Sequence, residues 1–490
     1  MPFPYDDNRV FMEECEKEGM LVTVKKEVDW NLEAGAIARR LAEQGLGRAV
    51  GAGGTPAVIF DKIKGFPKGF RMASQLNSGI DRIVKLFGYK GDPNKAKSDL
   101  QQVIRYALRN PVKPIRIDPK DAPCKQNKMV GDEVNLYKFP APMIHDGDGG
   151  RYIVGWAVTA TKDPDSNWVN WGTYRAMIIN KNTMSGLIIP GQHIGKIYRK
   201  YEERNEPMPF AAAICPDGIT FLIGACPVPD FVNEADVIGG LRKKALPVVK
   251  CETNDLEVPA FAEIVIEGVV PPRLRAWEGP FGEYTGYRAS PRDPRPIYQV
   301  KAITYRNDPI LAFSPVGVPV DENLGNAILS SGMAVDTLER LGIQARVWKV
   351  PEAGSCMVVV AVKRPTPNIA TMIKNALTSE MGQFAVYNFK FLIVNDDVDI
   401  FDANKILWVI GTRVHPRRGI IISDEICGPL TPYASLEERL KMNAPHVTFD
   451  ATWPLDWHPS IAVPPVSSFE TIFPKDLQDK VLSNWKEYGL

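Results

Sequence analysis

The sequence predicts a mixed α+β fold: an N-terminal α/β domain, a β-rich central domain, a long linker helix and a C-terminal α/β domain. The length of 490 residues corresponds to about two to four domains. The 39 glycines and 41 prolines indicate many turns and therefore much β structure. Helical and strand patterns alternate near both ends, while strand-like runs dominate the middle. We expect these four parts at residues 1–125, 126–320, 321–345 and 346–490.

The first part begins with a helix that Asp7 caps and Gly19 ends. A strand over Met20–Val24 follows. The next helix, Leu32–Leu46, places Leu32, Ile37 and Leu41 on one face, which predicts that this face is buried. A short buried strand over Ala57–Phe60 completes an α/β pattern.

Strand-like runs at short spacing characterise the central part and favour a barrel or a sandwich. The expected strands are Tyr152–Thr161, Thr173–Ile179, Ile219–Cys226, Ala260–Val270 and Ile297–Tyr305. Two helices interrupt them, at Gly191–Glu203 and Ala235–Arg242.

Apolar residues at helical spacing predict one long helix over Asp321–Leu341. Strand and helix alternate after it, which predicts a parallel sheet. Its expected elements are Cys356–Val362, Asn368–Thr378, Phe389–Val394, Asn404–Ile410 and Gly419–Ser423. The tail, Thr448–Leu490, is rich in proline and tryptophan, and we expect it to pack on a neighbouring domain or on a partner subunit.

Charge and hydropathy exclude several classes of protein. The net charge of +1 argues against a dedicated nucleic-acid binder. The N-terminus lacks the apolar stretch of a signal peptide, and no apolar run approaches the ~18 residues of a membrane span. Seven cysteines without a CxxC pair indicate reduced thiols. We therefore expect a cytoplasmic protein without a membrane or nucleic-acid partner.

Three polar residues in the central part form a possible metal-binding set. Asn170 precedes a strand, His193 enters a helix start and Glu234 lies in the first turn of another helix. Each alone is more often structural than metal-binding. Together they offer mixed oxygen and nitrogen ligands, which suit Mn²⁺ or Mg²⁺ better than a closed zinc site. Lys196 and Arg199 follow His193, and cations near a helix start suit a phosphate.

Two glutamates, Glu278 and Glu283, lie in a segment bent by glycine and proline. Such a loop can turn both carboxylates into one cavity. One of them could pair with Arg175, while the other, removed from water, could hold a proton near pH 7. The alternative is a solvated acidic loop.

These segments resemble the UbiD-type family of prenylated-FMN-dependent (de)carboxylases. The resemblance spans most of the chain and is strongest in NWGTYR, PVPDFVNEADVIGGLR, VVKCETNDLEVPAFAEIVIEG and EGPFGEYTGY. It implies a central split β-barrel that binds prenylated FMN. It also implies that Asn170, His193 and Glu234 hold Mn²⁺ or Mg²⁺ at the cofactor phosphate, with K⁺ beside it.

The resemblance further assigns roles at the cofactor. The implied cradle is Thr173, Tyr174, Arg175, Leu187, Ile188, Ile189, Gln192 and His193. Lys441 would contact the phosphate, although its surroundings, RLKMNAP, depart from the family's common G-S-K-M-G form. Arg175, Glu278 and Glu283 would form the catalytic set, with Glu283 as the proton donor.

The implied function is the reversible, non-oxidative decarboxylation of an aromatic, heteroaromatic or α,β-unsaturated carboxylic acid, with CO₂ as the other product. An FMN prenyltransferase would supply the cofactor, and a homodimer or homohexamer is expected. The residues alone leave two alternatives, an ordinary FMN oxidoreductase and a non-catalytic subunit of a carboxylase complex. They do not identify the acid.

Overall fold

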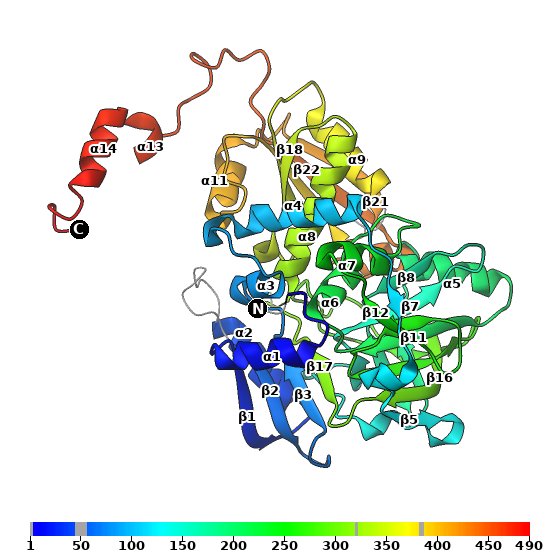
Figure 1. Ribbon diagram of the computed structural model, residues 1–490. Coiled ribbons are helices and arrows are strands. Elements are labelled where there is room, and N and C mark those ends of the chain that lie inside the picture. Colours follow the sequence, from blue (N-terminus) through cyan, green and yellow to red (C-terminus); the bar gives the residue numbers. More distant parts are fainter. Residues whose placement is uncertain (1–2, 45–55, 319–321, 382–386) are drawn as a thin grey trace.

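The computed structural model describes residues 3–44, 56–318, 322–381 and 387–490. In these ranges the chain forms four sheets with helices packed between and around them (Figure 1). The N-terminal sheet lies at one end of the molecule, the C-terminal sheet at the other, and the largest sheet beside them. The mixed α+β fold predicted from the sequence is confirmed.

The N-terminal sheet has the order β1-β2-β3-β17. Its strands are Leu21–Val28, Ala57–Ile63, Arg71–Ser74 and Ile310–Phe313, and its helices are α1 (Asn8–Lys17), α2 (Glu33–Gln44), α3 (Ile80–Leu86) and α4 (Ala96–Arg109). Asp7 caps α1 as predicted, since its side chain accepts the N–H of Arg9 at 2.9 Å. The fourth strand, β17, comes from far along the chain and runs parallel to β3.

The predicted buried face of α2 is confirmed in part. Ile37 and Leu41 are partly buried and pack against the hydrophobic core, beside the fully buried Ala34, Gly35 and Ala38, whereas Leu32 lies just before the helix. A Cβ at Gly35 would lie 2.1 Å from the carbonyl oxygen of Ile144. The backbone of α2 therefore packs directly against the segment that contains Ile144, and small residues allow that approach.

The central sheet has ten strands and curls into a half-barrel. Its path is β6-β9-β10-β16-β14-β11-β7-β8, and β5 and β15 also pair with β16. The strands are β5 (Asn127–Val130), β6 (Tyr152–Val154), β7 (Ala157–Lys162), β8 (Val169–Gly172), β9 (Ala176–Asn180), β10 (Thr183–Gly186), β11 (Met208–Ile214), β14 (Ile264–Val270), β15 (Arg275–Glu278) and β16 (Asp293–Tyr305). A small sheet of β4 (Ile115–Arg116), β12 (Pro247–Lys250) and β13 (Glu257–Pro259) lies beside it.

Two predicted central helices are confirmed as α5 (His193–Glu203) and α7 (Glu234–Arg242). The strand predicted over Ile219–Cys226 is wrong, because these residues form helix α6 (Gly218–Gly224). Asp217 caps α6 by accepting the N–H of Thr220 at 3.1 Å. Most of α6 is buried, so its apolar run carries no helical period that the sequence could reveal.

The long predicted helix is α8 (Asn323–Arg340), which is buried along most of its length. It packs against α4, where a Cβ at Gly332 would lie 2.4 Å from Ile104 Cγ2. Gln101 of α4 also donates a hydrogen bond of 3.1 Å to the carbonyl oxygen of Val347. The predicted boundary between residues 320 and 321 lies outside the described residues, and the four-part division of the chain stays a prediction.

The C-terminal sheet has the order β18-β19-β20-β22-β21. Its strands are Ala345–Lys349, Met357–Val362, Lys390–Asn395, Asn443–Asp450 and Ile420–Ile426, in that order, with helices α9 (Ile369–Glu380) and α11 (Ala403–Arg413). β19, β20 and β22 are parallel, as expected, but the edge strands β18 and β21 are antiparallel. The sheet is therefore mixed rather than purely parallel.

The tail after β22 runs away from the body of the molecule and carries the short helix α13 (Phe469–Ile472) and α14 (Lys475–Ser483) (Figure 1). Apolar side chains on it are exposed, among them Ile461, Leu482 and Leu490. Its predicted role in packing on a partner subunit stays a prediction. Within the described residues, the structure contains no helix with the length and apolar character of a membrane span.

Candidate active site

The loop that carries Glu278 and Glu283 is held against the segment before β6. Asp148 accepts the N–H of Gly282 at 2.9 Å and contacts His145 Nδ1 at 3.0 Å. A Cβ at Gly149 would lie 2.2 Å from the carbonyl oxygen of Gly279, so only glycine permits this approach. The two segments thus fix the direction in which the loop presents its carboxylates.

The carboxylates of Glu278 and Glu283 both point into the protein and contact Arg175. The side chain of Glu278 is fully buried and receives hydrogen bonds from Arg175 Nε at 3.0 Å and Nη2 at 3.2 Å. Arg175 also forms an ion pair with Glu283, and both of these side chains are 9% exposed. The loop is therefore not a solvated acidic loop. Charge-assisted bonds of this kind are the strong ones in proteins.

Aromatic residues surround the three charged groups. Tyr152 donates a hydrogen bond of 2.6 Å to Glu278 Oε1, and burial followed by the Glu278 charge raises the tyrosine pKa far above its usual value. The ring of Phe281 lies 4.2 Å from that of Tyr152 and 5.2 Å from the guanidinium carbon of Arg175. The cluster is thus a preorganised polar centre in apolar surroundings, where electrostatic interactions are stronger than in water.

The three predicted metal ligands lie in one neighbourhood at the start of α5. His193 Nδ1 is 3.2 Å from Glu234 Oε1, and the other oxygen of Glu234 accepts the N–H of Trp171 at 2.8 Å. Asn170 Nδ2 contacts the hydroxyl of Tyr174 at 3.1 Å. All three predicted ligands are at most 2% exposed.

Sequence reasoning did not single out Asp230, although it lies within the quoted motif PVPDFVNEAD. Its carboxylate lies 3.0 Å from His193 Nε2 and 2.5 Å from Lys196 Nζ. The hydrogen bond from His193 is the main cause that lowers the pKa of Asp230 to about 2. Both ring nitrogens of His193 therefore face carboxylates, an arrangement that attracts positive charge.

This donor set fits a divalent metal with oxygen and nitrogen ligands. Across residues 3–44, 56–318, 322–381 and 387–490, no three His, Cys, Asp or Glu side chains gather as a metal site. A metal at this place would therefore depend on the amide oxygen of Asn170 beside His193 and Glu234. Such a mixed set suits Mn²⁺ or Mg²⁺ at a cofactor phosphate.

A cavity of about 170 Å³ lies next to this neighbourhood. Thr173, Tyr174 and Gln192 of the predicted cradle line it, together with the backbone turn after α6. The opposite wall comes from Tyr284, α8 and the C-terminal part of the chain: Asn323, Asn326, Lys349, Ser355, Tyr387 and Asn388. The cavity thus joins the predicted cofactor cradle to the C-terminal sheet.

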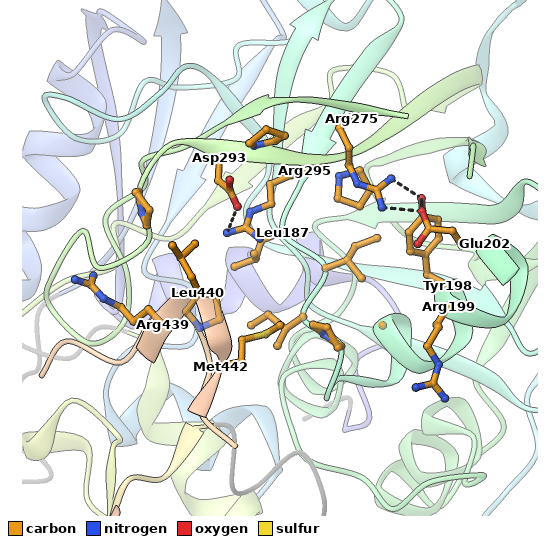
Figure 2. A pocket seen from close by; sticks show the side chains of 18 of the residues that line it. Leu187, Tyr198, Arg199, Glu202, Arg275, Asp293, Arg295, Arg439, Leu440 and Met442 are labelled. Atoms are coloured by element: carbon orange, nitrogen blue, oxygen red, sulfur yellow. Dashed lines mark hydrogen bonds and ion pairs between the residues drawn. The ribbon is translucent and has the colours of Figure 1, made fainter. Parts of the chain in front are cut away.

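A second cavity, of about 360 Å³, has Leu187, Ile188 and Ile189 of the predicted cradle in its wall. Figure 2 shows its charged lining, in which Arg275 pairs with Glu202 at 2.7 Å and Arg295 with Asp293 at 3.1 Å. Two of the four arginines that line this cavity are therefore neutralised by carboxylates of the same wall.

A hydrophobic cluster connects the two cavities. Leu187, Ile189 and Met442 face the larger cavity, while Tyr284 and Tyr387 face the smaller one. Gln192 donates a hydrogen bond to the hydroxyl of Tyr387 and so links the cradle to the C-terminal part. Six of the eight predicted cradle residues of the central part therefore line one of these cavities, whereas Arg175 lies with the two glutamates and His193 lies beside Glu234.

Lys441 lies away from both cavities and from the predicted cradle residues. It lies at the end of α12 (Leu436–Lys441), its side chain is 70% exposed, and it pairs with Glu437 at 2.6 Å. It lines neither cavity. Arg199 lines the rim of the larger cavity, but its side chain is 75% exposed and pairs with Glu203 at 3.5 Å. The predicted phosphate contact of Lys441 stays a prediction that this geometry does not favour.

Three family profiles match the chain in order along its length. They are described as the N-terminal, Rift-related and C-terminal domains of 3-octaprenyl-4-hydroxybenzoate carboxy-lyase, and they match residues 12–103, 116–319 and 334–450. The Rift-related profile includes the Arg175 cluster and the His193 neighbourhood.

Characterised relatives are similar over almost their whole length. The chain is 30% identical to pyrrole-2-carboxylic acid decarboxylase of Pseudomonas aeruginosa, over 99% of this chain and 98% of the relative. It is also 30% identical to ferulic acid decarboxylase 1 of Saccharomyces cerevisiae, over 98% of each chain.

Solved structures show the same architecture. The vanillic acid decarboxylase of Sedimentibacter hydroxybenzoicus in its closed form superposes with a TM-score of 0.87, at 27% identity and 99% coverage of both chains. The UbiD-class enzyme HmfF of Pelotomaculum thermopropionicum, in complex with prenylated FMN, superposes with a TM-score of 0.76, at 25% identity. That match covers 93% of this chain and 96% of the other.

Proposed function

Since this chain belongs to the UbiD family of carboxy-lyases, we propose that it removes CO₂ from an aromatic, heteroaromatic or α,β-unsaturated carboxylic acid, reversibly and with prenylated FMN. The observation that carries the proposal is the buried cluster of Arg175, Glu278 and Glu283. A scaffold subunit has no use for two buried carboxylates on one arginine. An oxidoreductase with ordinary FMN has no task for them either.

The cofactor has a defined place in this proposal. Asn170, His193 and Glu234 would hold Mn²⁺ or Mg²⁺ at its phosphate, with K⁺ nearby, and Thr173, Tyr174 and Gln192 would line its site. Bound prenylated FMN supplies an electron sink for the charge left on the ring carbon when CO₂ departs.

The residues of the chain handle the carboxylate and the proton. Arg175 orients the substrate carboxylate and keeps Glu278 in place through two charge-assisted bonds. Glu283, once it has taken up a proton in place of its ion pair with Arg175, donates that proton to the carbon that has lost CO₂. In the reverse direction Glu283 removes that proton. The aromatic surroundings of Tyr152 and Phe281 exclude water from these steps.

The decisive experiment is a decarboxylation screen. Protein produced together with an FMN prenyltransferase is tested for CO₂ release from a panel of aromatic and unsaturated acids, and for CO₂ uptake in bicarbonate-rich buffer. We expect turnover of at least one acid. Protein that carries prenylated FMN and turns over none of them would contradict the proposal.

The absorption spectrum and the mass of the bound flavin separate the alternatives. Unmodified FMN together with reduction by a nicotinamide would support the oxidoreductase instead. Protein that binds no flavin would support the non-catalytic subunit. Light scattering measures the homodimer or homohexamer that we propose for the assembly.

A further inference from the structure

One histidine connects residues 278–288, the glutamate loop, to two other segments of the chain. His145 Nδ1 lies 3.0 Å from Asp148 Oδ2, and its Nε2 lies 2.9 Å from the carbonyl oxygen of Val316. The ring also lies against the loop itself, because a Cβ at Gly282 would be 2.6 Å from His145 Nδ1. The imidazole is therefore in contact with its own segment, with the glutamate loop and with the segment after β17.

The carboxylate of Asp148 holds the glutamate loop in place. Its side chain is fully buried, and Oδ1 accepts the N–H of Gly282, the neighbour of Glu283, at 2.9 Å. Its Oδ2 accepts the backbone N–H of His145 at 3.1 Å and also contacts the ring. Of the residues that the structure describes, only His145 forms an ion pair with Asp148. A buried carboxylate needs an opposite charge, and His145 is the group that can supply it.

The two partners of the ring indicate which form of His145 is present. Both oxygens of Asp148 accept backbone N–H groups, which favours the ionised carboxylate. An ionised carboxylate and a carbonyl oxygen accept hydrogen bonds and donate none. Neutral imidazole has one N–H and could bond to only one of them, whereas the imidazolium has two and bonds to both. The geometry therefore selects a positively charged His145.

The segment after β17 gives this arrangement a fixed support. Residues 314–318 follow the last strand of the N-terminal sheet, and Arg39 of α2 donates a hydrogen bond of 2.7 Å to the carbonyl oxygen of Pro315. The glutamate loop touches the same segment, because a Cβ at Gly286 would lie 2.2 Å from one of its methyl groups. His145 thus ties the glutamate loop to the N-terminal sheet.

We propose that His145 is a positioning residue: its imidazolium holds Asp148, and thereby the glutamate loop, so that Glu283 faces the reacting carbon. This inference rests on the proposed function and adds a residue to it. The ring of Phe281 lies 6.0 Å from that of His145 and 5.2 Å from the guanidinium carbon of Arg175, so the loop contacts both groups. His145 exchanges no proton with the substrate. A displacement of about 1 Å can cost about 100-fold in rate, so loss of His145 should slow the chemical step rather than weaken binding.

The first test measures the glutamate loop without cofactor or substrate. Hydrogen exchange of residues 278–288 is followed by mass spectrometry in flavin-free wild type, His145→Gln and His415→Gln. Exchange should be roughly 10-fold faster in His145→Gln, because Asp148 loses its opposite charge and holds the loop less firmly. His415 is exposed and accepts the N–H of Arg417 at 3.2 Å in the C-terminal part, so His415→Gln should leave the exchange unchanged.

The second test separates binding from chemistry in cofactor-loaded protein, with the acid that reacts fastest in the decarboxylation screen. His145→Gln should lower kcat by roughly 10- to 100-fold and change KM and flavin content by less than about twofold. Thermal melting checks that the variant is folded, and His145→Asn repeats both tests with a shorter amide.

A double variant tests the charge of His145. His145→Gln/Asp148→Asn leaves no unpaired carboxylate, and its amides can bond to each other and to the N–H of Gly282. Its kcat should therefore be about 10-fold higher than that of His145→Gln. If His145 only filled space, the second substitution would bring no recovery.

Three results in these variants would overturn the inference. The first is wild-type loop exchange and kcat in His145→Gln. The second is a double variant no faster than His145→Gln, because Asp148 would then not depend on the charge. The third is His145→Gln that loses flavin while its loop exchanges normally, which would assign His145 to the cofactor. Loaded wild-type protein that turns over no acid would overturn the proposed function, while faster exchange in His145→Gln would still support its hold on the loop.

Discussion

Replacing Arg175 by methionine tests the energetic role of the charged cluster. In Arg175→Met, the fully buried Glu278 loses both of its charge-assisted bonds and keeps Tyr152 as a partner. Glu283 loses its ion pair as well. Breaking a buried pair by removing one partner costs about 3–5 kcal/mol, because the other charge remains buried. For a cooperative unit of 150–250 residues, this lowers Tm by roughly 6–20 °C.

The measurement uses flavin-free protein, so that loss of cofactor does not contribute. Urea unfolding and thermal melting are followed by tryptophan fluorescence for Arg175→Met, Glu278→Gln and the double variant. The double variant should recover about 2 kcal/mol or more relative to Arg175→Met, since the unpaired charge of the fully buried Glu278 is then removed and only that of Glu283 remains. Arg295→Met is the matched control, because its pair with Asp293 is partly exposed and worth about 0–1 kcal/mol.

Two results would refute this reasoning. Wild-type stability of Arg175→Met would mean that Glu278 does not depend on the arginine. A double variant whose loss equals the sum of the two single losses would mean that the residues are not energetically coupled.

Four further predictions concern the proton, the metal site, pH and the tail. Glu283→Gln should lower turnover at least about 100-fold and retain flavin; normal turnover would rule out its role as proton donor. Glu234→Ala should purify with little flavin or metal, and a full complement of both by mass spectrometry would argue against the metal site. Burial lowers the pKa of His446, whose ring nitrogens lack hydrogen-bond partners, to about 4. The stability that neutral His446 contributes should therefore be fully present above its unfolded pKa of about 6.5. The free energy of unfolding should fall by roughly 3 kcal/mol as the pH drops from there to 4. Urea unfolding should show this loss in the wild type and not in His446→Gln. Deleting residues 452–490 should lower the number of subunits per oligomer, measured by light scattering, without changing the melting of the body; an unchanged number of subunits would show that the tail does not hold subunits together.

Elements with a cap or a clear period were predictable from the sequence. Asp7 marked the start of α1, and the apolar spacing marked α8. The strand predicted at Ile219–Cys226 failed because a helix that is buried on most sides shows no period. The direction of β21 was not predictable either, since strand pairing depends on contacts between distant residues. Local patterns thus specify elements more fully than their arrangement.

For the candidate site, too, the sequence predicted single residues better than their arrangement in space. The resemblance to the family identified Arg175, Glu278 and Glu283, which the residues alone left open, and only the structure shows that all three are buried together. Asp230 is one of two further acidic residues in its motif, with Asp236, and only the structure shows that Asp230 is the one beside His193.

The strand β17 has a consequence for synthesis of the protein on the ribosome. It completes the N-terminal sheet beside β3, although the two strands lie about 240 residues apart in the chain. At translation rates of 5–20 residues per second, the edge of β3 stays unpaired for on the order of 10 to 50 seconds until β17 has been synthesised. An open strand edge is a template for pairing with other chains. We therefore expect chaperones to bind the nascent N-terminal segment. Residues 1–125 expressed alone should aggregate unless a peptide with residues 310–313 is supplied.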